Sequence, residues 1–160
     1  MSGPRTNDHP SAGERLADTF GELVRRESRT LVYGELTAGL HPAVDASTYP
    51  VLSGLDRAGP RSAARLGQEI GLDRSVVSRH ADRLQQAGLL RREPDPTDRR
   101  ASLLVLTPEG TRLVTHMRAR LADHFNAYLA TWPAEESEAF AQALARFTRE
   151  ALLPRDKWAK

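Results

Sequence analysis

The 160-residue sequence contains no cysteine, which excludes disulfide bonds, thiolate zinc sites and cysteine-based redox sensing. It also lacks any apolar run near the ~18 residues that a membrane-spanning helix needs, so no membrane partner is expected. Residues 1–12 are polar and rich in proline and glycine, without the apolar stretch of a signal peptide. We therefore expect a disordered leader followed by one globular domain in a cytoplasmic protein.

What the sequence does have is an uneven distribution of charge. Although the net charge is only +2, residues 57–112 hold eleven arginines against seven acidic residues. Residues 121–150 hold two arginines against five acidic residues. Clustered arginine is typical of a surface that binds phosphate. Arginine outnumbers lysine 21 to 2 in the whole chain, however, so a general bias toward arginine explains the charge alone equally well.

Apolar residues recur at helical spacing along most of the chain and predict a mainly α protein. The helices are expected at residues 14–40, 48–58, 61–70, 74–87, 108–130 and 134–153. In the last of them, Phe140 and Leu144 are expected to face the inside. Thr107 is a suitable N-cap for the fifth helix, because a proline follows it at the first helical position.

The third and fourth helices meet at a tight turn. Gly71 suits the left-handed backbone that ends the third helix, and Asp73 is a good N-cap for the fourth. The period then changes, and two short strands are expected at residues 89–93 and 102–106, around a turn-rich tip. Two helices joined in this way and followed by a β-hairpin wing are typical of the winged helix-turn-helix, an α+β fold that binds DNA.

The fourth helix has one face for the core and one suited to DNA. Val77, Ala81 and Leu84 recur at helical spacing, which leaves arginines and serines on the other side. Arg79 can donate two hydrogen bonds to a guanine edge, whereas Arg83 lies further along, where a phosphate contact is expected. The DNA contacts expected outside the wing are Arg61, Ser62, Arg74, Ser75, Val76, Ser78, Arg79 and Arg83. A solvated amphipathic helix is the competing interpretation.

The hairpin tip gives more specific evidence for DNA binding. Arg99 and Arg100 on a short protruding loop can enter a minor groove, where narrow A/T tracts attract arginine. Asp98 alone would repel phosphate, so we expect it to pair with a neighbouring arginine and orient it. The alternative is an exposed charged turn of little consequence.

Several runs in this region resemble the MarR family of winged helix-turn-helix transcriptional regulators. These runs are residues 62–67, 73–79, 84–92, 95–100 and 104–110. The resemblance spans about residues 49–110, and its most specific part is the Asp-x-Arg wing followed by Leu-x-Leu-Thr and glycine. By this pattern, Arg100 enters the minor groove and Asp98 orients it.

The resemblance implies a homodimer that binds a palindromic operator in double-stranded DNA, usually as a repressor released by a small molecule. Residues 46–110 would form the DNA-binding lobe, between an N-terminal dimerisation helix at 13–45 and C-terminal dimerisation helices at 111–160. It also implies an effector pocket between the lobe and the dimerisation helices. The residues expected there are Tyr33, Leu36, His41, Tyr49, Leu52 and Arg65, with His116 nearby.

His80 departs from this resemblance, because the family usually has an apolar residue at the position. Two interpretations remain open. The side chain is partly buried and hydrogen-bonded, or it titrates and makes DNA binding sensitive to pH.

The sequence lacks the residues that a metal site or an enzyme active site requires. A metal sensor needs three or four converging ligands, which the spacing of the histidines does not provide, so neither metal nor cofactor is expected. There is no glycine-rich phosphate loop and no nucleophile elbow, so we do not expect an enzyme. The remaining alternative is a protein-interaction module that has kept the dimer and lost DNA binding. The full set of Arg74, Arg79, Arg99 and Arg100 favours DNA binding over this alternative.

Overall fold

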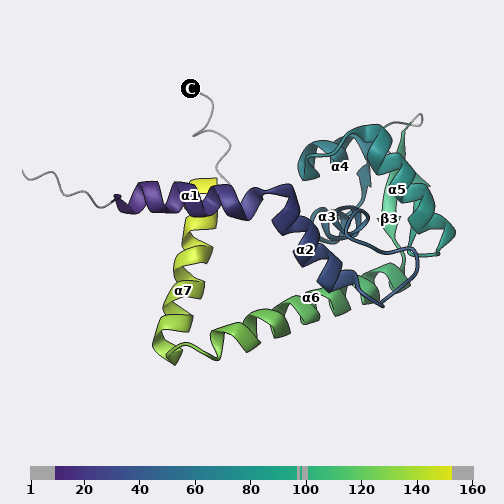
Figure 1. The fold of residues 1–160 in the computed structure, drawn as a ribbon. Coiled ribbons are helices and arrows are strands. Elements are labelled where there is room, and N and C mark those ends of the chain that lie inside the picture. The colour runs from purple at the N-terminus through teal and green to yellow at the C-terminus, as the bar shows by residue number, and fades with distance from the viewer. Residues whose placement is uncertain (1–9, 97, 99–100, 153–160) are drawn as a thin grey trace, which may run out of the picture. The chain divides into compact units, whose positions relative to one another are not determined.

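The computed structural model describes residues 10–96, 98 and 101–152. In chain order its elements are α1 (Ala12–Val24), α2 (Arg26–Thr37), α3 (Tyr49–Ala58), β1 (Arg61–Ser62), α4 (Ala63–Ile70), α5 (Arg74–Gln86), β2 (Leu90–Pro94), β3 (Ser102–Leu106), α6 (Pro108–Leu129), α7 (Ala134–Phe147) and the π-helical turn η1 (Thr148–Leu152). The predicted fold, mainly α with a small β wing, is confirmed (Figure 1). The chain divides into two compact units, residues 1–117 and 118–160, whose boundary lies within α6.

The first unit has a closed apolar core. Helices α3, α4 and α5 pack against one another, and the sheet lies beside α5 (Figure 1). The buried cluster between them consists of Val44, Val51, Leu52, Leu55, Leu66, Val77, Ala81, Leu84, Leu89, Leu90, Leu104, Val114 and Met117. Each of these side chains is at most 6% exposed, so burial of apolar surface stabilises this unit within a single chain.

The sheet has one strand more than the predicted hairpin. β2 and β3 pair antiparallel, as expected, with Leu90 opposite Leu106 and Pro94 opposite Ser102. The other edge of β3 pairs with β1, which has only two residues. The helix predicted from Arg61 therefore begins two residues later, because these residues pair with β3 instead.

The prediction of one helix over residues 14–40 is wrong. Ser11 caps α1 in a reciprocal capping box with Glu14, and α1 ends at Val24. Arg25 then takes an extended conformation, with φ −56° and ψ 143°. The Ser28 hydroxyl donates a hydrogen bond of 2.9 Å to the carbonyl oxygen of Glu22. This bond satisfies a terminal carbonyl of α1, so the break costs little and α2 starts separately.

The second unit contains the end of α6, then α7 and η1. Trp132 lies at the turn between the helices, and its ring centroid is 5.9 Å from that of Tyr128 and 5.5 Å from that of Phe140. α7 buries none of its residues. The expectation that Phe140 and Leu144 face inside is therefore wrong for a single chain, where they are 46% and 50% exposed.

Candidate nucleic-acid interface

A helix-turn-helix is formed by α4 and α5. The Ser62 hydroxyl caps α4 by accepting a hydrogen bond of 3.3 Å from the amide of Arg65. Gly71 ends the helix in the left-handed region, with φ 69° and ψ 37°. Gly67 lies where the turn folds back, and a Cβ there would lie 2.5 Å from the carbonyl oxygen of Leu72. The close approach of α5 to α4 therefore requires glycine at this position.

One face of α5 belongs entirely to the core. Val77, Ala81 and Leu84 have no exposed surface, which fixes the rotation of the helix about its axis. The predicted DNA-contact residues of α5 lie on the remaining surface. Four of them, Arg74, Ser75, Arg79 and Arg83, are exposed, while Val76 and Ser78 are half-buried.

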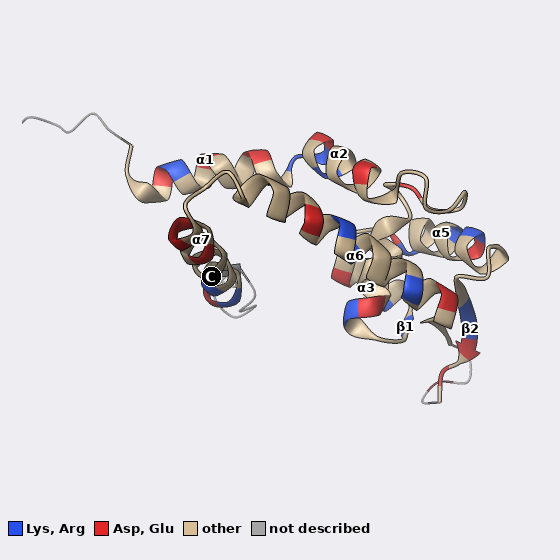
Figure 2. Ribbon diagram, turned by 90° about the horizontal axis from the view of Figure 1, so that it is seen from below, with Lys and Arg blue, Asp and Glu red and all other residues tan. Residues whose placement is uncertain are grey.

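Most arginines near α5 are held in ion pairs, and two on α5 are not. Arg92 of β2 donates hydrogen bonds to Asp82 at 2.7 Å and to Gln85 at 3.1 Å, which ties the wing to α5. Within the described part of the chain, Arg74 and Arg79 form neither a hydrogen bond nor an ion pair through their side chains. Their charge is therefore available to a ligand outside this chain. The basic positions of β1, α5 and β2 are blue in Figure 2.

The wing is held at both ends. The amide of Asp95 donates to the carbonyl oxygen of Ala101 at 3.1 Å, which closes the hairpin above the strands. At the base, the Thr107 hydroxyl donates to the carbonyl oxygen of Gly88 at 2.7 Å and accepts from the amide of Gly110 at 3.1 Å, as an N-cap of α6. Asp98 is exposed near the tip. Arg99 and Arg100 lie outside the described residues.

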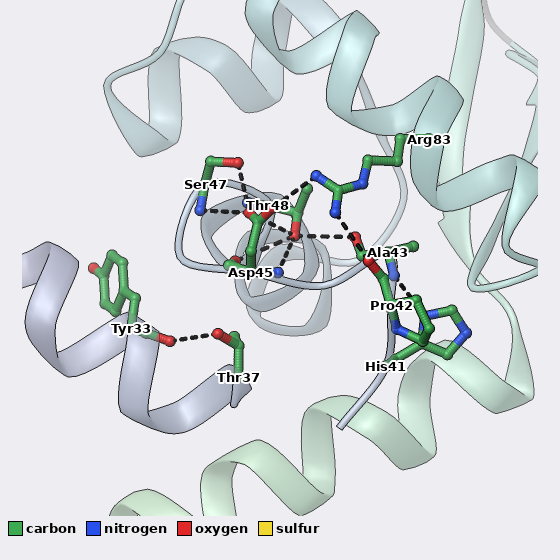
Figure 3. Close-up of polar contacts among 9 residues, drawn as sticks. All are labelled: Tyr33, Thr37, His41, Pro42, Ala43, Asp45, Ser47, Thr48 and Arg83. Carbon is green, nitrogen blue, oxygen red and sulfur yellow. Dashed lines mark hydrogen bonds and ion pairs between the residues drawn. The ribbon is translucent and has the colours of Figure 1, made fainter. Parts of the chain in front are cut away.

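Three other predicted DNA contacts have partners within the chain. Ser62 is the N-cap of α4, and half-buried Arg61 lies 3.3 Å from the Glu69 carboxylate. Arg83 has a more extensive set of contacts (Figure 3). Its Nη1 donates to Oδ2 of Asp45 at 2.7 Å, and its Nη2 donates to the carbonyl oxygen of Pro42 at 3.0 Å. These contacts join α5 to the loop before α3.

A cavity of about 480 Å³ opens in the first unit beside the same loop. Of the residues predicted to line an effector pocket, only Tyr33 does so. Leu36 and Leu52 are buried, 4% and 0% exposed, and belong to the interior. His41, Tyr49 and Arg65 are not among the lining residues, although the Tyr49 ring centroid lies 4.6 Å from that of Tyr33.

Sequence reasoning missed the cationic wall of this cavity. Its arginines are Arg26 and Arg29 on α2 and Arg57 on α3, and α5 contributes His80. The one carboxylate in the lining, Glu69, is already paired with Arg61 and Arg65. Arg26 and Arg29 are three residues apart on one helix, a spacing that was visible in the sequence. The contribution of Arg57 was not visible, because it depends on how α3 packs.

His80 is half-buried and makes no hydrogen bond within the described part of the chain. Burial, together with the neighbouring charges of Arg79 and Arg83, lowers the pKa of the imidazole, against the opposing effect of Asp45. His80 therefore gains its proton at a lower pH than an exposed histidine does. The expectation of partial burial is confirmed, and that of a hydrogen bond is wrong for the described residues.

The described residues show neither a metal site nor a membrane-spanning helix. Among them, no three His, Asp or Glu side chains converge as a metal site would require. None of the described helices combines the length and hydropathy needed to cross a membrane.

The chain is similar to known proteins in both sequence and fold. A model of the MarR family matches residues 39–101. The uncharacterized HTH-type transcriptional regulator YxaD of Bacillus subtilis is 31% identical over 106 residues, which are 66% of this chain and 74% of that protein. The crystal structure of RV1404 from Mycobacterium tuberculosis is 24% identical with a TM-score of 0.69, covers 92% of this chain and 99% of its own, and shows the fold alone.

The transcriptional regulator PcaV of Streptomyces coelicolor, crystallised with its natural ligand, is 28% identical with a TM-score of 0.54. The match covers 94% of this chain and 99% of that one. The predicted winged helix-turn-helix is thereby confirmed. From the paired helices, the wing and these similarities, the chain belongs to the MarR family of HTH-type transcriptional regulators.

Proposed function

We propose that this protein is a repressor that binds a palindromic operator as a homodimer and is released by a small molecule. The observation that carries the proposal is that Arg74 and Arg79, on the exposed face of α5, have no side-chain hydrogen bond or ion pair with any of the described residues. The opposite face of α5 is fully buried, so the helix is presented to a ligand in one orientation. A rigid helix with free guanidinium groups suits the major groove.

The expected division of contacts follows from position along the helix. Arg79 and the adjacent Ser75 and Val76 meet base edges, and Arg74 meets phosphate near the N-terminus of α5, where the helix dipole also favours an anion. At the wing, Arg100 enters the minor groove and Asp98 orients it. The substitution Arg100→Ala is expected to weaken binding at the outer ends of the operator.

Dimerisation is supported by apolar side chains that a single chain leaves exposed. On α1 and α2 these are Leu16, Phe20, Leu23, Val24, Leu31 and Val32, and in the second unit they are Phe125, Tyr128, Phe140 and Leu144. Their exposed fractions run from 37% to 72%. Large apolar side chains gathered on such helices mark protein interfaces. We assign residues 13–45 and 111–160 to contacts with a second copy, which would present a second α5 to the other half of the operator.

The cavity supports release by a small anion. Its volume of about 480 Å³ lies within the usual range for small-molecule sites. Arg26, Arg29 and Arg57 have no ion-pair partner among the described residues, and Tyr33 offers an aromatic wall. PcaV, which is similar over most of its length, was crystallised with a ligand. An aromatic carboxylate would combine both contacts.

Release would follow from a change in the distance between the two α5 helices. A dimer reads half-sites about one turn, ~34 Å, apart, so a shift of a few ångströms removes one of them. Such a regulator acts on DNA in the cytoplasm, and its activity requires no enzymatic step.

Selection from a random double-stranded DNA library, followed by binding measurements over a range of salt concentrations, tests the function. We expect enrichment of a palindrome, and an affinity that falls steeply with salt as counterions are released. No enriched sequence, with a flat dependence on salt, would contradict the proposal.

Benzoate is a suitable probe for the cavity, with benzamide as its uncharged control. Benzoate is expected to weaken operator binding and benzamide to have little effect. The double substitution Arg29→Gln with Arg57→Gln is expected to abolish the response to benzoate. An equal response to both compounds would contradict the assignment of an anion site.

A further inference from the structure

We infer that Asp45 and Arg83 are positioning residues for DNA binding, which hold α5 against the loop before α3. The inference rests on the proposed function, because it concerns how the helix expected to bind DNA is oriented. Arg83 lies on the exposed side of α5, where sequence alone predicts a phosphate contact. Its side chain is instead directed at Asp45 and Pro42 of its own chain (Figure 3).

The loop end of this contact is well anchored. Oδ1 of Asp45 accepts hydrogen bonds from the amide of Ser47 at 2.8 Å, from its hydroxyl at 2.6 Å and from the amide of Thr48 at 3.1 Å. Thr48 has no exposed surface, and its hydroxyl accepts from the amide of Asp45 at 2.9 Å. The carboxylate therefore cannot move without disturbing the buried start of α3.

The two carboxylate oxygens of Asp45 have different hydrogen-bond partners. Oδ1 bonds the loop, whereas Oδ2 accepts from Arg83 at 2.7 Å. Partial burial acts to raise the pKa of this carboxyl, but the hydrogen bonds from Ser47, Arg83 and Thr48 lower it well below its usual range. Asp45 is thus a fixed negative charge at every pH at which the protein would meet DNA.

The contact requires an arginine at position 83, and a lysine could not replace it. Nη1 and Nη2 bond two different acceptors, the carboxylate of Asp45 and the carbonyl oxygen of Pro42. A lysine carries its charge on one nitrogen and lacks the planar, forked arrangement of donors that fits both acceptors. The contact therefore restrains both the distance and the angle between α5 and the loop.

The same loop forms part of the cavity. Ser47, which Asp45 holds, lines the cavity, and so does His80, which lies one helical turn before Arg83 on α5. The Asp45–Arg83 pair therefore contacts both the loop that lines the cavity and the helix expected to bind DNA.

Asp45→Asn distinguishes two roles of Arg83, positioning of α5 and contact with phosphate, because they predict opposite changes in operator affinity. If Arg83 binds phosphate, Asp45→Asn removes a nearby negative charge and leaves operator affinity unchanged or raises it. If the pair positions α5, the same substitution lowers affinity, because Arg83 loses its charged acceptor. The pair is about half exposed, so we expect a loss on the order of fivefold.

The test measures operator affinity as a function of salt for Asp45→Asn, Arg83→Gln, the double variant and Arg83→Lys. We expect each single substitution to reduce affinity by a similar factor and the double variant to lose no more than either, because the residues act as a unit. The salt dependence should stay that of the wild type, whereas loss of a phosphate contact would reduce its slope by about 0.9. Glu109→Gln, which removes a carboxylate from the exposed pair with Arg112, is the matched control.

Amide hydrogen exchange of the free protein gives a second readout that needs no DNA. Faster exchange in α5 and in residues 38–48 of the Asp45→Asn variant, with an unchanged core, is expected. Wild-type affinity and wild-type exchange in Asp45→Asn, or a reduced salt slope in Arg83→Gln with full binding by Arg83→Lys, would overturn the inference. If the wild type binds no DNA, the proposed function fails and hydrogen exchange alone decides on the positioning pair.

Discussion

The core around α3, α4 and α5 differs from the second unit in how far its apolar side chains are buried, whereas α1 and α2 expose apolar side chains as the second unit does. In the first, thirteen apolar side chains around α3, α4 and α5 are at most 6% exposed. In the second, Phe125, Tyr128, Phe140 and Leu144 are 46% to 62% exposed, and α7 buries nothing. The core is therefore closed within one chain, whereas the second unit, like α1 and α2, has the apolar surface that we propose a second copy covers.

The largest effect is expected from removal of a core side chain. Leu84→Ala leaves a cavity beneath α5 and should lower the free energy of unfolding by about 3 kcal/mol. Leu144→Ala removes the same atoms from an exposed site and should change the dissociation constant of the dimer instead. Urea unfolding at several protein concentrations distinguishes the two. Equal losses that do not depend on concentration would contradict the comparison.

A charge introduced on the exposed apolar surface of α7 is expected to prevent dimerisation without affecting the core of the first unit. Leu144→Glu is expected to produce a monomer with an intact lobe, because the carboxylate must be desolvated at the interface. Without the second half-site, operator affinity should fall about 100-fold. Sedimentation velocity and DNA binding measure both effects. Gln142→Glu, which adds the same charge to the same helix, is the control, and a dimeric Leu144→Glu protein would refute the assignment.

Within the lobe, paired and unpaired arginines should differ in their importance for DNA binding. Arg79→Ala removes a guanidinium group that has no partner among the described residues, and it should cost about 1–3 kcal/mol of binding free energy, with relaxed preference for one base. Arg91→Ala removes a side chain already bonded to Glu93 at 2.7 Å and should cost much less. Fluorescence titration against the selected operator and its single-base variants measures both. A larger loss of operator affinity in Arg91→Ala than in Arg79→Ala would argue against α5 as the helix that recognises the bases.

The smallest expected effect concerns pH. Burial and nearby arginines lower the pKa of His80 in the folded protein, so the unfolded chain binds a proton at a higher pH than the folded chain does. Stability should therefore fall as pH decreases below about 6.5, the ordinary histidine value. Unfolding at pH 7.5 and 5.5 should show a smaller difference in His80→Gln than in the wild type. The same pH dependence in both proteins would exclude His80 as its source.

The sequence predicted the parts of this protein that depend on periodicity and local turn chemistry. Val77, Ala81 and Leu84 identify the buried face of α5 because the helical repeat alone places them together. The end of α4 at Gly71 was predictable because few residues other than glycine adopt its backbone conformation.

The features that escaped prediction depend on contacts between distant segments. Arg83 and Asp45 are 38 residues apart, and no local pattern relates them. The cavity combines residues of α2, α3, α4 and α5, so its cationic wall appears only after the helices pack. At the break after α1, the carbonyl oxygen of Glu22 accepts from the Ser28 hydroxyl and from the Arg25 amide, and the apolar periodicity of the sequence does not reveal these contacts.

The most direct test of the proposed regulator is the stoichiometry of its complex with the selected operator. Sedimentation of the complex, with the wild type and the Arg74→Ala, Arg79→Ala double variant, measures mass and affinity together. We expect two chains per palindromic duplex for the wild type and no sequence-specific complex for the variant. One chain per duplex at full affinity, or specific binding that survives the double substitution, would contradict it.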